Sequence, residues 1–165
     1  MHKFYEEPEK NLPPFVPFFI AVLIWLVIVV AVAHSCAKAE MIDINAIIQI
    51  ESSGNPYAVS KDNCIGLMQI SEAVRQEYNY NKTPSQMMSK HDLFCPAYNV
   101  GIGVWYINIR ISQLLRTYHL PDTVENRLIA YHDGIGNLVK YRQGKRNLGP
   151  AMKGYLKKYA KLTKG

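Results

Sequence analysis

The residue best suited to acid–base chemistry is a glutamate placed among apolar residues. The spacing of i, i+3, i+4 and i+7 would place on one face of a helix the residues Ile44, Ile47, Ile48 and Glu51. A carboxylate on an apolar helix face is poorly solvated, which raises its pKa, and the negative end of the helix dipole disfavours ionisation further. Such a group can hold a proton and act as a general acid. Taken alone, however, these residues favour an inert buried glutamate bonded to a tyrosine or arginine.

Several helices are expected to position this glutamate. Its own helix should begin at Asp43, which can cap the first turn, and end at Gly54-Asn55-Pro56. A second helix should open at Ser71, the longest core helix should run from Asn99 to about Tyr118, one capped by Asp122 and Glu125 should run to about Tyr131, and the last should begin near Pro150. No segment alternates convincingly as a strand, so we predict a mainly α domain.

Three ordered blocks carry a family resemblance. Residues 51–60 read Glu-Ser-Ser-Gly-Asn-Pro-Tyr-Ala-Val-Ser and residues 66–70 read Gly-Leu-Met-Gln-Ile. They are followed by Asn99-Val100 with Gly103, Tyr106 and Ile107, and by Ala130-Tyr131-His132-Asp133-Gly134. In this order the blocks resemble the lytic transglycosylases related to goose-type lysozyme, over roughly Ile42 to Tyr159. The sequence of these blocks most resembles that of the small specialised enzymes of secretion, conjugation and phage-entry machines.

Two positions depart from the family pattern. Asn63-Cys64 stand where the family more often has Gly-Ala, and His132-Asp133 stand where it usually has Asn-Ala. The second departure falls in a block expected to contact substrate, so substrate contacts there should differ from the family's.

The resemblance implies a lysozyme-like fold that cuts peptidoglycan glycan strands at the β-1,4 bond between N-acetylmuramic acid and N-acetylglucosamine. Glu51 would be the catalytic residue, without metal or cofactor, and the muramic 6-hydroxyl would attack to give a 1,6-anhydro product. Substrate-binding roles would fall to Ser60, Met68, Gln69, Tyr131 and Tyr155, the last bonding the catalytic acid. Without the motifs, Ser60 could cap a helix, Met68 could be core, and either tyrosine could be amphipathic packing.

Two alternatives to a transglycosylase stay open. A second carboxylate would make the enzyme a muramidase that adds water, and Asp62 and Asp133 are the candidates, although both lie in turn sequences where Asp commonly bonds the local backbone. The other alternative is an inactive wall-binding subunit of a secretion or virion assembly.

The first part of the chain differs from the rest. Residues 15–33 are nineteen consecutive residues without a charge, which as a helix would reach about 28 Å. We therefore expect a short tail at 1–14, a transmembrane anchor at 15–33, a linker at 34–41 and the catalytic domain at 42–165. The domain should face the wall on the periplasmic side, or belong to a virion membrane. The alternative is a signal peptide cleaved after Ala37-Lys38-Ala39.

Positive charge collects at the other end of the chain. The net charge is +6, and after Asp133 there are nine Lys or Arg and no acidic residue. This charge suits an anionic partner such as peptidoglycan and its attached polymers, or lipid headgroups. No nucleic-acid-binding module accompanies it, so we expect no specific nucleic-acid partner. Cys64 and Cys95 could form a disulfide outside the cytoplasm or remain free thiols.

Overall fold

The computed structural model describes Val22, Trp25 and residues 41–164. The chain divides into two compact units, Met1–Ala39 and Glu40–Gly165, and the second contains the helices that carry the predicted site. The span expected at 15–33 lies outside the described residues, apart from Val22 and Trp25. None of the helices in the described part of the chain is long and apolar enough to cross a membrane.

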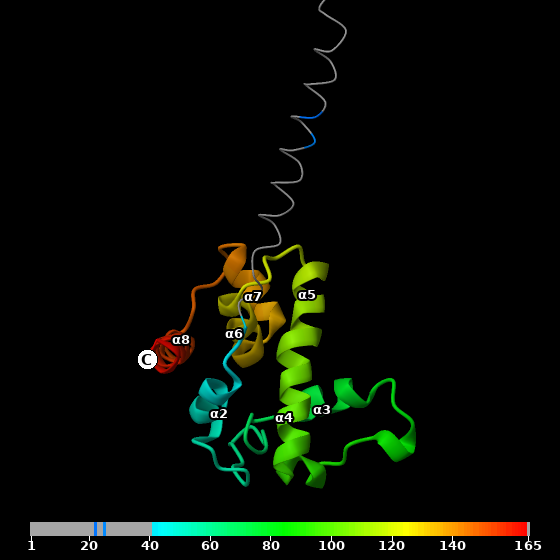
Figure 1. Cartoon of the computed structure of the whole chain (residues 1–165). Helices are drawn as coiled ribbons and strands as arrows, with labels where there is room; N and C mark the ends of the chain where they lie inside the picture. Colours follow the sequence, from blue (N-terminus) through cyan, green and yellow to red (C-terminus); the bar gives the residue numbers. More distant parts are fainter. Residues whose placement is uncertain (1–21, 23–24, 26–40, 165) are drawn as a thin grey trace, which may run out of the picture. The chain divides into compact units, whose positions relative to one another are not determined.

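The second unit is built from helices. In its described residues the extended structure is limited to isolated bridges that pair Ile65 with Val59 and Ile70. The mainly α prediction is therefore confirmed. The elements, labelled as in Figure 1, are α2 (Ile44–Ser52), α3 (Glu72–Asn79), the 3-10 turns η1 (Pro84–Gln86) and η2 (His91–Phe94), α4 (Pro96–Trp105), the π-helix η3 (Tyr106–Arg110), α5 (Ile111–Thr117), α6 (Val124–Asp133), α7 (Ile135–Arg142) and α8 (Pro150–Thr163).

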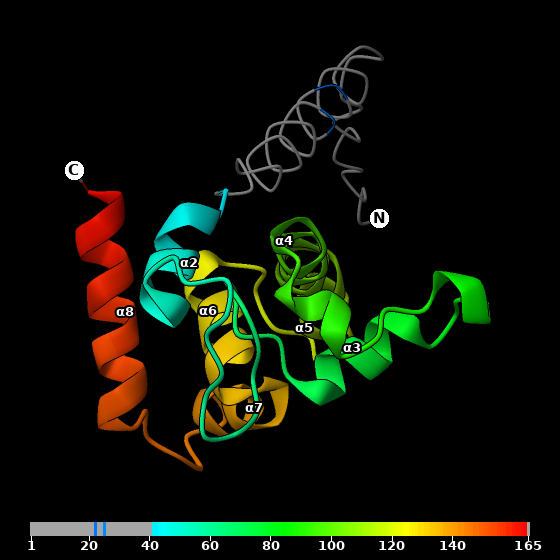
Figure 2. The same cartoon turned by 90° about the horizontal axis from the view of Figure 1, so that it is seen from below.

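A long central helix organises the unit. α4, η3 and α5 follow one another without a break, which confirms the core helix expected from Asn99 to about Tyr118, and it begins three residues earlier because Pro96 suits the first helical position. One of its faces is fully buried, at Ile102, Ile107, Ile111 and Leu115. α6 lies between the central helix and α8 and contacts both of them. α8 also packs along α2 (Figure 2).

Local side chains fix where the helices begin. Asp43 accepts a hydrogen bond from the Ala46 N–H and caps α2 as predicted, and Ser71 does the same for α3. The prediction for α6 was wrong by one residue, since Thr123 is its cap and Asp122 instead pairs with Arg127 at 2.5 Å. α6 then runs on to Asp133, two residues past the expected end.

Two further features were not settled by the sequence. α7 was not predicted; it starts directly after Gly134, whose φ of +84° favours glycine and separates it from α6. Cys64 is half-buried and Cys95 exposed, and both are free thiols, so of the two alternatives the structure has the unpaired one.

Candidate active site

Glu51 lies in the last turn of α2 and is bonded from the opposite end of the chain. The Tyr155 hydroxyl, on α8, donates a hydrogen bond of 2.9 Å to Glu51 Oε1. Tyr155 is 4 % exposed, so its ring is held in the core while its hydroxyl reaches the carboxylate. The contact depends on the packing of α8 along α2, which brings together residues 104 positions apart.

The surroundings of Glu51 favour its protonated form. Burial raises the pKa of the Glu51 carboxyl above its usual value, as expected from its place on an apolar helix face. The Tyr155 hydrogen bond and the nearby charge of His132 act in the other direction, because both stabilise the carboxylate, but burial dominates. Glu51 therefore has the balance that a group needs to give up a proton and then take one back.

Two clefts meet at Glu51. The inner cleft has a volume of about 470 Å³, and among its lining residues are Glu51, Ser60, Gln69, Tyr106, Tyr131 and His132. The outer cleft, of about 370 Å³, lies against α8, and its lining includes Ile50, Glu51, His132, Pro150, Tyr155 and Lys158. Glu51 and His132 line both clefts, so a polymer chain that occupies the two clefts would run past the Glu51 carboxyl at their junction.

The inner cleft brings together three of the predicted substrate-binding residues. Ser60 lines it, and its hydroxyl also accepts a hydrogen bond from the Cys64 N–H within its own turn. Gln69 adopts a left-handed backbone, with φ of +49°, and its amide donates to two carbonyls of the surrounding loop. The Tyr131 hydroxyl donates to the Met68 carbonyl at 2.6 Å, which fixes the tyrosine ring at the cleft wall.

Met68 is placed differently from the other predicted residues. Its side chain is fully buried and does not line either cleft. It packs on the central helix at Gly103, where a Cβ would lie 2.3 Å from the methionine sulfur. Of the alternatives that the sequence left open, the structure has Met68 as a core residue, so it acts on the site through its carbonyl and through the loop it anchors.

Asn99 holds that loop from beneath. Its amide donates to the carbonyls of Ile65 and Leu93 at 2.8 Å, and its Oδ1 accepts from the Met68 N–H at 2.8 Å. Gly66, with φ of +79°, lies so close that a Cβ would be 2.2 Å from the Asn99 amide nitrogen. These motif residues are therefore structural, and they set the position of the loop that carries Gln69.

The sequence had marked His132 only as a departure from the family pattern, and the structure places it where the two clefts meet. His132 Nδ1 lies 2.8 Å from Asp133 Oδ1, and the imidazole meets the Tyr155 ring edge-on at 4.8 Å between centroids. Asp133 is also 3.8 Å from Arg146. The imidazole is thus oriented by Asp133. The sequence signal that could have identified His132 was its departure from the family pattern.

Asp62 and Tyr106 complete the inner cleft. Asp62 is the one acidic residue besides Glu51 among the described residues that line it, whereas Asp133 is turned to His132 and Arg146. Tyr106 lies 5.9 Å from Tyr131, ring to ring. Its place in the Asn99 block could have predicted this position. Within residues 41–164, no three His, Cys, Asp or Glu side chains are grouped to hold a metal ion.

Comparison with known proteins agrees with this geometry. The chain is 39% identical over 100 residues to the endo-type membrane-bound lytic murein transglycosylase A of Cronobacter sakazakii, 37% identical to the protein of the same name from an Enterobacter species, and 39% identical to the membrane-bound lytic murein transglycosylase E of Buchnera aphidicola. Each alignment covers 59% of this chain.

The chain spans about half the length of these curated relatives, at 49%, 49% and 47%. No solved structure gives a significant match. The model of the Transglycosylase SLT domain matches residues 34–152, which is more than half of the chain and includes all three sequence blocks. The matched residues include Glu51, whose carboxyl has a raised pKa and lies at the junction of the two clefts. The chain therefore belongs to the SLT transglycosylase domain family.

Proposed function

We propose that this protein is a peptidoglycan lytic transglycosylase with a lysozyme-like domain and that Glu51 is its catalytic residue. The observation that carries the proposal is the setting of Glu51, a carboxyl of raised pKa, bonded to Tyr155, where two clefts meet. The relatives named as lytic murein transglycosylases support the substrate, which would be the glycan strand of the wall.

The reaction needs only one carboxyl. Glu51 donates its proton to the glycosidic oxygen between N-acetylmuramic acid and N-acetylglucosamine, and the C1–O bond breaks. The 6-hydroxyl of the muramic residue then attacks C1, and the Glu51 carboxylate accepts the hydroxyl proton, which yields a 1,6-anhydro product and restores the acid. Between these two transfers the carboxylate is ionised, and the hydrogen bond from Tyr155 stabilises it.

The other residues of the two clefts would hold the strand. Ser60, Gln69 and Tyr131 line the inner cleft and can contact sugar hydroxyl and acetamido groups, while Tyr155 lines the outer one. Met68 contributes the carbonyl that fixes Tyr131.

A muramidase of the same fold is the second candidate, because Asp62 lines the inner cleft with Glu51. In that reaction a water, activated by the second carboxylate, would replace the 6-hydroxyl. Asp62→Asn separates the two: it would abolish a hydrolase and leave a transglycosylase active.

The deciding experiment is mass spectrometry of the products released from purified sacculi. A transglycosylase gives muropeptides with anhydro ends, and products heavier by one water would instead establish the muramidase. Glu51→Gln should abolish release, with Glu125→Gln as the matched control, since Glu125 is exposed and pairs with Arg142 away from the clefts. If Glu51→Gln cleared sacculi as fast as wild type, the protein would be a wall-binding subunit rather than an enzyme.

We also propose that residues 15–33 anchor the enzyme in a membrane with the catalytic domain on the wall side. The uncharged run in the sequence and the word "membrane-bound" in the relatives' names support this. Intact mass of the protein from the membrane fraction tests it, because a chain that starts at Glu40 would mean that the segment is cleaved.

The role we propose is a local opening of the wall for a secretion, conjugation or phage-entry machine. The resemblance of the sequence blocks to such specialised enzymes supports it. Deletion of the gene should impair assembly of that machine without a general defect in wall growth, and a general growth defect would contradict this role.

A further inference from the structure

A third concavity lies away from Glu51. This distal groove has a volume of about 710 Å³ and is larger than either cleft at the proposed active site. It is formed between α3 and the central helix, and among its lining residues are Glu77, Tyr80, Asn81, Trp105, Arg110 and Gln113. Nothing in the proposed cleavage reaction uses it.

An aromatic path leads from the inner cleft to the distal groove. Tyr131 and Tyr106 line the inner cleft, with ring centroids 5.9 Å apart. Tyr106 is in turn 6.2 Å from Trp105, which lines the groove. α3 gives the same continuity on the facing side, because Val74 lines the cleft and Glu77, one turn later, lines the groove. The distal groove therefore adjoins the cleft that holds Glu51.

The lining of the distal groove suits an uncharged ligand. Its only charged lining residues in the described part of the chain are Glu77 and Arg110, which neutralise each other through a hydrogen-bonded ion pair at 2.5 Å. The side-chain amides of Asn81 and Gln113 make no hydrogen bond to other described residues and are available to a ligand. A peptide stem carries carboxylates and amines that this neutral groove would not favour.

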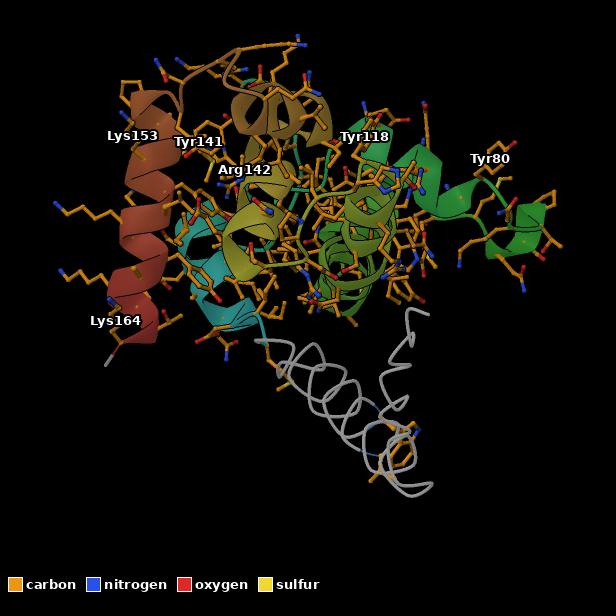
Figure 3. The ribbon with its side chains drawn as sticks, turned by 90° about the horizontal axis from the view of Figure 1, so that it is seen from above. Tyr80, Tyr118, Tyr141, Arg142, Lys153 and Lys164 are labelled. Atoms are coloured by element: carbon orange, nitrogen blue, oxygen red, sulfur yellow. The ribbon has the colours of Figure 1, made fainter. Side chains whose placement is uncertain are left out.

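Aromatic surfaces supply the rest of the recognition. Tyr80 is 83 % exposed and projects at the end of α3 (Figure 3). The Trp105 and Tyr78 rings pack edge-to-face, with their centroids 5.0 Å apart. A pyranose ring has an apolar face of C–H groups that stacks on such surfaces and a rim of hydroxyls that bonds to amides. Trp105 directly precedes the π-helix η3 of the central helix and Arg110 is its last residue, and such distortions are found frequently at functional sites.

We propose that the distal groove binds the sugars of the glycan strand that lie beyond those held beside Glu51, and so makes the enzyme prefer long strands. The identity of the polymer rests on the proposed function, while the chemical class of the ligand, an uncharged sugar chain, rests on the groove itself.

The test compares long glycan strands, stripped of peptides by an amidase, with a tetrasaccharide of the same repeat. The measured quantity is the ratio of kcat/KM for the long substrate to that for the short one. Tyr80→Ala and Trp105→Ala should lower this ratio about fivefold to tenfold, through a higher KM for long strands, and Trp105→Phe should restore part of it. Tyr118→Ala is the matched control, because Tyr118 is an exposed tyrosine, 48 % accessible, that lines no part of the groove.

A second measurement keeps this test separate from that of the proposed function. The full chain carrying Glu51→Gln is titrated with the long strands, with and without Tyr80→Ala, and the Tyr80 change should weaken binding by the same factor. An unchanged ratio and unchanged affinity would overturn the groove proposal even if cleavage is established. A loss seen only with peptide-bearing strands would also overturn it, in favour of the stem peptide. If the wild-type chain releases nothing, the proposed function fails, and the affinity measurement still decides the groove.

Discussion

Tyr155→Phe tests the chemistry of Glu51 with the smallest possible change. The substitution removes the hydroxyl that donates to Glu51 Oε1 at 2.9 Å and leaves the buried ring in place. That hydrogen bond lowers the pKa of Glu51 by stabilising its ionised form, so its loss raises the pKa. A hydrogen bond to a charged group contributes about 1.5–3 kcal/mol, and since Glu51 is only half-buried we take the lower end, which corresponds to about one pH unit.

The assay is the pH dependence of kcat/KM for release of soluble muropeptides. In the proposed reaction protonated Glu51 is the active form, so activity should fall as pH rises through its pKa. Tyr155→Phe should therefore move the basic limb upward by about one unit, and it should lower kcat at the optimum by about tenfold because the ionised intermediate state loses its donor. A basic limb that stays in place, or moves down, would refute the assignment of Glu51 as the acid held by Tyr155.

Tyr159→Phe is the matched control for this experiment. Tyr159 lies one turn further along α8, and its hydroxyl accepts a hydrogen bond of 2.8 Å from the Asp43 N–H. Its removal should cost about 1 kcal/mol of stability, visible as a lower Tm, with no shift of the basic limb. A shift of equal size in both variants would mean that α8 has moved and that the Tyr155 result is structural.

Three further predictions concern the loop, the imidazole and the basic helix. Gly66→Ala should destabilise the protein by about 3 kcal/mol in denaturant unfolding, because the new Cβ meets Asn99 and the left-handed backbone is strained, whereas Gly101→Ala, where nothing lies within 4 Å, should not destabilise it. His132→Asn removes a charge that lowers the pKa of Glu51 and should move the basic limb upward at low salt, an effect that high salt screens, unlike that of Tyr155→Phe. Lys157→Glu with Lys161→Glu should weaken binding to sacculi several-fold at low salt and leave it unchanged at high salt.

Helix patterns in the sequence predicted much of this fold. The central helix has a buried residue at each turn from Ile102 to Leu115, and such periodicity needs no knowledge of the partner that covers it. Helix ends were less certain. Asp122 and Thr123 can both cap α6, and only the backbone geometry decides that Thr123 does. α7 escaped prediction because it is only eight residues long and follows α6 after a single glycine.

The site could be predicted only in part. Motif order located Glu51, Gln69 and Tyr131, but a motif does not say whether a side chain faces substrate or core, and so Met68 was expected in a subsite while the structure buries it. His132 has two contacts in the site, one with its neighbour Asp133 and one with Tyr155 of α8, and the second joins segments that no local pattern connects.

α8 shows most clearly why geometry was needed. Its Tyr159 hydroxyl bonds the backbone at the start of α2, and its Tyr155 hydroxyl bonds Glu51 at the end of α2, so one helix holds both ends of the helix that carries the proposed catalytic carboxyl. Lys158 of the same helix lines the outer cleft together with Glu51 and Tyr155. Yet the family match ends at residue 152, before either tyrosine. The protonation of Glu51 therefore depends on a segment outside the matched region, and relatives that keep the three sequence blocks but differ in this helix should differ in the pH dependence of cleavage.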